Sequence, residues 1–128
     1  MHTHQTQVGR WGEDLAVAVL SGSGYRLIDK NWRPQRSQAG LTLRGEIDAV
    51  YLTPKDHIAF VEVKTRTTAD YGLPVEALTP EKRRKLRELV GAWRLSHQEF
   101  QRHSYHIDVV SIIGTADHFA FEHRQAVV

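Results

Sequence analysis

The chain has 128 residues, 41% of them hydrophobic, which suits one folded domain over 1–128 and argues against intrinsic disorder. It contains no cysteine, which excludes disulfides, a thiol nucleophile and cysteine-ligated zinc. The net charge is only +2, so a nucleic-acid partner is permitted but not demanded. No apolar run approaches membrane-spanning length and the first residues lack a signal peptide's apolar core, so we expect a cytoplasmic protein that does not bind membranes.

The first part of the chain predicts a helix over 8–23, because apolar residues recur there at helical spacing and Gly24 is suited to end it. Glu13 shares the inward face with Ala16 and Leu20, where an acid needs a partner. The alternative is an acid favoured by the positive end of the helix dipole.

The segments before and after this helix can be assigned from composition and residue pattern alone. Residues 1–7 are expected to be disordered, 25–29 to form a first strand, and 34–43, which is polar and shows no periodicity, to form a loop.

Two stretches, 44–52 and 58–65, are rich in β-branched and aromatic residues and read as strands, and the turn-forming residues 53–57 between them predict a hairpin. Placing Leu52 opposite Ile58 also sets three further pairs: Val50 with Phe60, Asp48 with Glu62, and Glu46 with Lys64. These side chains share one face of the sheet. The other face is almost wholly apolar and carries Ile47, Ala49, Tyr51, Ala59, Val61 and Val63.

The pair of acids poses a physical problem, because like charges directly across a strand pair repel each other. Asp48 and Glu62 must share a proton, take a cation or point into water. Mg²⁺ prefers one or two carboxylates with water and phosphate oxygens, and Lys64 on the same face is suited to stabilise an attacking hydroxide or a phosphate oxygen. The alternative is a hairpin whose charged side faces solvent, although Ile58 and Phe60 beside the acids argue against it.

The second half of the chain predicts a helix that starts at Thr79-Pro80 and runs to about Glu99. Its expected buried stripe comprises Leu86, Leu89, Val90, Trp93, His97 and Phe100. Lys82 lies one turn before Leu86, so its amine can point toward the acids. The basic band Arg83, Arg84, Lys85 and Arg87 is either a solvated face or a set of contacts to backbone phosphates.

A buried strand over 105–113, a turn at 114–117 and a final edge strand over 118–122 complete the pattern. The expected fold class is therefore α/β: a mixed central sheet of about five strands flanked by helices, in the order αβββαββ.

Asp48-x13-Glu62-x-Lys64 resembles the signature of the PD-(D/E)xK nuclease superfamily, which has a restriction-endonuclease-like core. Further matches follow in order along nearly the whole chain: Gly12-Glu13, Asn31-x-Arg33, Gly45-Glu46-Ile47-Asp48, Val61-Glu62-Val63-Lys64-x-Arg66, Tyr71-Gly72-x-Pro74, Lys82 and Asp108-Val109-Val110. Together they are similar to the YraN-like family of small bacterial predicted endonucleases. The link between Asn31-x-Arg33 and Gly45 is longer here than is usual in that family.

The resemblance implies a metal-dependent endonuclease that hydrolyses phosphodiester bonds of DNA, including branched or repair intermediates, with Mg²⁺ or Mn²⁺. It implies that Asp48 and Glu62 hold the metal with the Val63 carbonyl, and that Lys64 orients or deprotonates the water. Glu13 would position a second ion or the water. Arg44, Arg66, Lys82 and Arg83 are the expected nucleic-acid contacts.

Two other functions stay open at this point. One is a nucleic-acid-binding module that keeps the nuclease core but turns over little or nothing, and the other is a scaffold whose basic helix meets an acidic partner. A homodimer is an attractive arrangement for the nuclease, because cutting both strands of a duplex needs two sites related by symmetry.

Overall fold

The structure is a computed structural model, and it describes residues 7–35, 43–67 and 79–128. The expectations for 1–6, for most of the 34–43 loop and for the Tyr71-Gly72-x-Pro74 motif fall outside these residues. The elements, in chain order, are α1 (Gln7–Gly22), β1 (Arg26–Trp32), β2 (Ile47–Leu52), β3 (Ile58–Arg66), α2 (Pro80–Ser96), the short 3-10 helix η2 (Gln98–Phe100), β4 (Tyr105–Thr115) and β5 (His118–Arg124).

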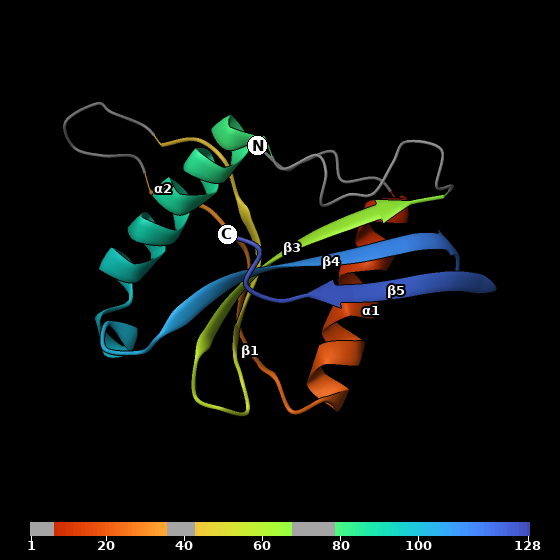
Figure 1. Cartoon of the computed structure of the whole chain (residues 1–128), viewed down its shortest axis with the longest axis horizontal. Coiled ribbons are helices and arrows are strands. Elements are labelled where there is room, and N and C mark those ends of the chain that lie inside the picture. Colours follow the sequence, from red (N-terminus) through yellow and green to blue (C-terminus); the bar gives the residue numbers. More distant parts are fainter. Residues whose placement is uncertain (1–6, 36–42, 68–78) are drawn as a thin grey trace.

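The strands form one sheet in the order β1-β2-β3-β4-β5 (Figure 1). Neighbouring strands are antiparallel except β3 and β4, which run parallel because α2 crosses over between them. The predicted α/β class, the five-stranded mixed sheet and the order αβββαββ are confirmed. Within the described residues, neither helix is long and apolar enough to cross a membrane.

Helix α1 packs on one face of the sheet through its small residues. A Cβ at Gly12 would overlap the Thr65 hydroxyl of β3, so glycine allows the close approach at this position. Ala16 and Leu20 are buried against β2, β3 and β4, and Glu13 is buried beside them as predicted. Val19 of the same helix is exposed.

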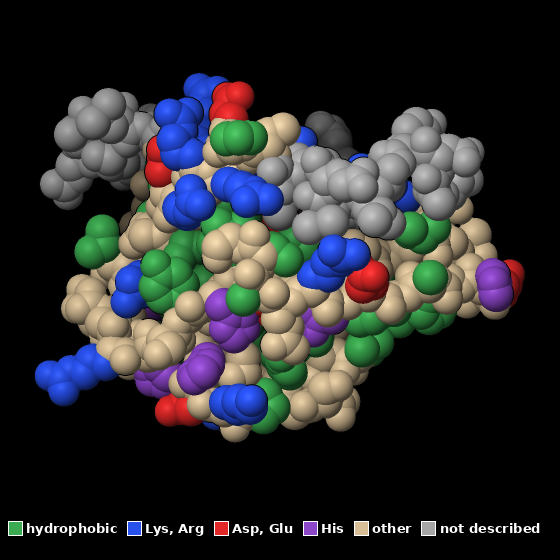
Figure 2. Space-filling model, in the orientation of Figure 1, with side chains coloured by type: hydrophobic (Ala, Val, Ile, Leu, Met, Phe, Trp, Pro, Cys, Tyr) green, Lys and Arg blue, Asp and Glu red, His purple; other side chains and the backbone are tan. Residues whose placement is uncertain are grey.

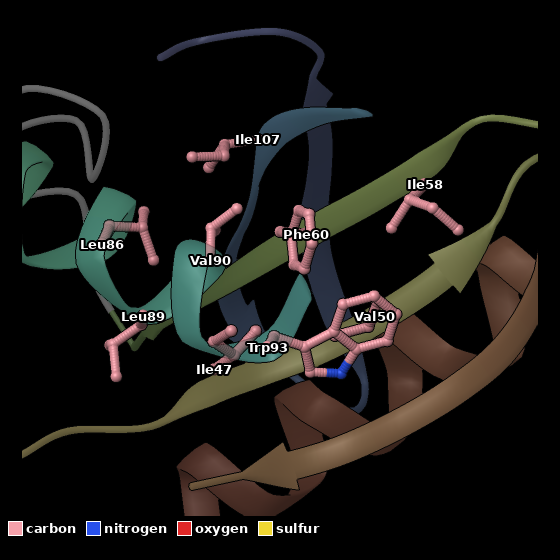
Figure 3. Close-up of a cluster of buried hydrophobic side chains, with 9 residues drawn as sticks. All are labelled: Ile47, Val50, Ile58, Phe60, Leu86, Leu89, Val90, Trp93 and Ile107. Carbon is pink, nitrogen blue, oxygen red and sulfur yellow. The ribbon is translucent and has the colours of Figure 1, made fainter. Parts of the chain in front are cut away.

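Helix α2 covers the opposite face, and Leu86, Leu89, Val90 and Trp93 point from it toward the sheet (Figure 3). The indole N–H of Trp93 donates to Asp29 of β1 at 2.8 Å, which fixes the helix against the sheet. The helix ends at Ser96, three residues before the predicted end at Glu99.

The early end of α2 has a local cause. The ring of His97 stacks on that of Trp93 at 3.9 Å, and its Nδ1 lies 2.7 Å from the Trp93 carbonyl oxygen. His97 also has the non-helical φ of −127°. The His97 ring therefore contacts the Trp93 carbonyl oxygen, which in a continuing helix would accept a hydrogen bond from the backbone N–H of residue 97.

The hairpin has the predicted register over its first four pairs, from Leu52 with Ile58 to Ala49 with Val61. The predicted pairs of Asp48 with Glu62 and Glu46 with Lys64 are not part of this ladder. The predicted face of Ile47 is wrong, because this residue packs with Val50 under α2. Both differences have one cause. The start of β2, Ile47 and Asp48, is not paired with β3, while Ile47 still pairs with Trp32 of β1.

Candidate metal and nucleic-acid site

The site begins where the β2–β3 ladder stops. Antiparallel pairing continued by two residues beyond Ala49 and Val61 would place Ile47 opposite Val63. Instead the Val63 N–H donates to Oδ2 of Asp48 at 2.8 Å. The N–H and C=O of one strand residue point to the same side, so the Val63 carbonyl points toward the space that β2 has left.

Asp48 and Glu62 contact each other at this break in the sheet, and the pKa of each is raised. Burial raises the pKa of Asp48 to about 6, against the lowering effect of the Val63 N–H, and the charges of Glu13 and Glu46 add to the rise. Burial also raises the pKa of Glu62 well above its ordinary value, followed by the charge of Asp48. A hydrogen bond shared between the two carboxyl groups acts in the same direction. The pair is therefore arranged as two acids that share a proton when no cation is bound.

Lys64 and Glu13 complete the set of predicted catalytic residues. The Lys64 amine lies 3.9 Å from Oε2 of Glu62, and its charge opposes the rise in pKa of both acids. Glu13 reaches the site from α1, and its effect on the pKa of Asp48 places it within electrostatic range of that carboxylate. The structure thus brings Asp48, Glu62, Lys64, Glu13 and the Val63 backbone together.

Asn31 is a member of the site whose role the sequence does not predict. Its amide nitrogen donates to Oε1 of Glu13 and to Oε1 of Glu46, at 2.8 Å in each case. Its backbone has a positive φ of 52°, a region that asparagine tolerates better than most residues. Arg33 then pairs with the other oxygen of Glu46 at 3.1 Å. The Asn31-x-Arg33 motif therefore holds two largely buried acids from different parts of the chain beside Asp48 and Glu62.

A hollow of about 220 Å³ opens above these acids, between the hairpin and α2. Its lining combines both signs of charge with apolar residues: Gly45, Glu46, Glu62, Lys64, Lys82, Lys85, Leu86 and Leu89. Figure 2 shows Lys and Arg side chains gathered over the N-terminal half of α2, next to this hollow. Lys82, a predicted nucleic-acid contact, therefore lines this hollow, and so does Lys85, for which the only sequence signal was the basic band of α2.

The other predicted nucleic-acid contacts lie elsewhere along the same elements. Arg44 is exposed just before β2, Arg66 is the last residue of β3, and Arg83 is half-buried on α2. Their proposed contacts stay predictions. Within the described ranges no three His, Asp or Glu side chains are gathered as a metal cage. A Mg²⁺ site does not require one, since it commonly uses one or two carboxylates, a carbonyl and water.

Comparison with known proteins points to one family. A relative from Clavibacter michiganensis subsp. michiganensis, a UPF0102 protein, is 40% identical over 111 residues, covering 87% of this chain and 86% of its own length. UPF0102 proteins from Mycolicibacterium gilvum and Bifidobacterium longum are 43% and 38% identical, covering 82% and 84% of this chain and 79% and 81% of theirs. The model of the uncharacterised protein family UPF0102 matches residues 12–112. The chain therefore belongs to the UPF0102 family, the YraN-like family whose motifs it carries.

Proposed function

We propose that this protein is a metal-dependent nuclease of the PD-(D/E)xK superfamily that hydrolyses phosphodiester bonds in DNA. The observation that carries the proposal is the contact between Asp48 and Glu62, two largely buried carboxyl groups with raised pKa at the break in the β2–β3 ladder. If these acids served only to stabilise the fold, we would expect each carboxylate to be paired closely with a lysine or arginine of the chain. Among the described residues, the cationic group paired with them is the Lys64 amine, which is 3.9 Å from Glu62 on a side chain that is 38% exposed.

The donor set fits a hard divalent cation. Asp48 and Glu62 supply carboxylate oxygens, and the Val63 carbonyl points to the same side, so Mg²⁺ or Mn²⁺ would find oxygen ligands only. Such an ion lowers the pKa of water and offsets the negative charge that develops on the attacked phosphate. Glu13, which accepts a hydrogen bond from Asn31, would position a second ion or the attacking water.

The chain's own cations have separate roles in this mechanism. Lys64 reaches from the acids into the hollow, where its charged amine orients the attacking water and balances charge on the phosphate; it could accept the water's proton only after releasing one of its own. Lys82 and Lys85 line the α2 wall of the hollow, where they are suited to hold a neighbouring phosphate of the strand. Arginine and lysine contacts of this kind carry no sequence information and make affinity depend on salt.

The test is cleavage of labelled branched, single-stranded and duplex DNA by the pure protein in Mg²⁺ or Mn²⁺. Asp48→Asn should reduce the rate at least about a hundredfold, the loss expected when a main transition-state contact is removed. Asp14→Asn is the matched control, because Asp14 is the exposed neighbour of Glu13 and pairs with Lys30 at the surface. Absence of cleavage, or cleavage undiminished by Asp48→Asn, would end the proposal.

A second function, nucleic-acid binding without turnover, is favoured by one observation. Asp48 and Glu62 already share a hydrogen bond, and the two acids beside them, Glu13 and Glu46, are already held by Asn31, so these carboxyl groups have partners within the chain itself. In that case gel shifts should appear without cleavage, weaken steeply with salt and be unaffected by Glu62→Gln. If Glu62→Gln instead binds DNA but no longer forms product, the result would support the nuclease and not the binding module.

A further inference from the structure

Two hollows lie along one side of α2. The first contains Glu62 and Lys64, as described above. The second has a volume of about 660 Å³ and lies at the C-terminal end of the helix, where it is lined by Trp32, Pro34, Gln35, Ala92, Leu95, Ser96 and His97, whose Nε2 is paired with Asp29 at 2.9 Å. Five α2 residues of the two hollows follow one another at alternating spacings of three and four, which places them on one stripe of the helix: Lys82, Lys85, Leu89, Ala92 and Ser96. Leu95 lies further round the helix, toward solvent. From Lys82 to Ser96 this stripe is about 21 Å long, at 1.5 Å per residue.

A side-chain contact joins the two hollows across the strands. Glu46 lines the first hollow and pairs with Arg33 at 3.1 Å. Arg33 stands between Trp32 and Pro34, which line the second hollow. An extended ligand that follows this side of α2 would pass the Arg33–Glu46 pair on its way from one hollow to the other, and the two hollows together are called the groove.

The two ends of the groove differ in chemistry. Three lysines, Lys64, Lys82 and Lys85, line the first together with Glu46 and Glu62, so its lysine rim attracts negative charge. The second is lined by an indole and by Leu95, which is 72% exposed, and no acid is among its described lining residues. The second hollow therefore suits a flat, uncharged group better than a phosphate.

We propose that this groove binds single-stranded DNA, with backbone phosphates at Lys82 and Lys85 and an unstacked nucleobase against Trp32. The choice of nucleic acid as the ligand rests on the proposed function. A single strand offers both phosphates and free base faces, whereas a duplex keeps its bases stacked and presents mainly charged backbone. A groove of this length suits about four nucleotides, the short end of single-strand site sizes.

The first test places a negative charge in the apolar hollow. Binding of a fluorescein-labelled oligothymidine of about eight nucleotides is followed by anisotropy in EDTA, against a duplex of equal length. The wild-type protein should bind the single strand more tightly, and Leu95→Glu should weaken that binding at least about fivefold. Leu95 is exposed, so the substitution leaves the core intact. Ser21→Glu adds the same charge at an exposed position of α1 and should leave binding unchanged.

The second test uses the tryptophan itself. Base stacking should quench part of the intrinsic fluorescence, and Trp32→Leu should remove this quenching and weaken binding about tenfold. Trp93 is fully buried and continues to report folding in that variant. Equal affinity for duplex, or equal behaviour of Leu95→Glu and Ser21→Glu, would overturn the groove assignment. Because EDTA prevents metal-dependent cleavage, these results are independent of turnover: failure to cleave in Mg²⁺ with the binding pattern intact would end the nuclease proposal alone.

Discussion

The carboxyl group of Asp48 is predicted to reduce the stability of the metal-free protein, and replacing it with a carboxamide should reveal by how much. Burial raises its pKa from 3.8 to about 6. Between these values the folded protein binds a proton that the unfolded chain releases. The contribution of Asp48 to stability is therefore greatest below about pH 4, falls as the pH rises toward about 6, and stays low above it.

The size of the effect follows from the shift. A rise of about two pKa units corresponds to about 3 kcal/mol, at 1.36 kcal/mol for each unit. In Asp48→Asn the introduced side chain would keep an oxygen that accepts from the Val63 N–H, now at 2.8 Å, and its amide can donate to Glu62 in place of the shared proton. We therefore expect Asp48→Asn to raise the free energy of unfolding by about 2 to 3 kcal/mol at pH 8 and by less than about 0.5 kcal/mol at pH 4.

Urea unfolding in EDTA, followed by tryptophan fluorescence at both pH values, measures this difference. Asp14→Asn is again the control, since an exposed pair such as Asp14 with Lys30 contributes less than about 1 kcal/mol at either pH. Mg²⁺ should stabilise the wild-type protein at pH 8 and leave Asp48→Asn unaffected. A variant that is less stable than wild type at pH 8 would show that the carboxylate is well satisfied without a cation, which refutes the reasoning.

Three further predictions concern the surroundings of the same acids. Gly12→Ala should destabilise the protein by about 2 kcal/mol, because the new methyl group would overlap Thr65. Gly22→Ala is the control: its methyl group would meet nothing within 4 Å, so it should be neutral or slightly stabilising. Thermal unfolding compares the two variants. Asn31→Asp should remove the donor that holds Glu13 and Glu46 and add a further acid, so its loss of stability should be larger at pH 8 than at pH 4, and a loss independent of pH would contradict the bridging role. Binding of Mg²⁺ at pH 6 should release protons, because the ion requires ionised carboxylates and the pKa of each acid is raised. Calorimetry in buffers of different ionisation enthalpy counts the released protons. A binding heat that does not depend on the buffer would argue against Asp48 and Glu62 as ligands.

Local sequence patterns were enough to predict the architecture. Alternation within 44–52 and 58–65, together with a turn of fixed length, determined the register, so the contact between Asp48 and Glu62 followed from counting residues. Thr79 and Pro80 located the start of α2, and the Thr79 hydroxyl does accept from the Lys82 N–H. The end of that helix was missed, because it depends on a ring stacking and a carbonyl contact that helical periodicity does not encode.

The inner part of the site could not be predicted in the same way. Asn31 is 18 residues from Glu13 and 15 from Glu46 along the chain, so only the folded sheet brings its amide to both. The missing pairing between β3 and the start of β2 is a second example. Ile47 pairs with β1 and not with β3, and the sequence contains no rule that decides between these two neighbours. The motif Asn31-x-Arg33 indicated that these residues matter, but not what they hold.

The arrangement of charge explains why the site would need both a basic rim and a metal. The side chains of Glu46 and Glu62 are only 8% and 15% exposed, whereas those of Arg33 and Lys64 are 36% and 38% exposed. The acids thus lie inside and the cations around them. A phosphate that reaches only the rim meets positive charge, so binding there is sensitive to salt and needs no metal. A phosphate that moves inward to be attacked meets Asp48 and Glu62, and like charges at that distance repel in a poorly solvated site unless a cation lies between them. If the proposed function holds, binding without a metal and cleavage only with one would be two consequences of the same placement of charge.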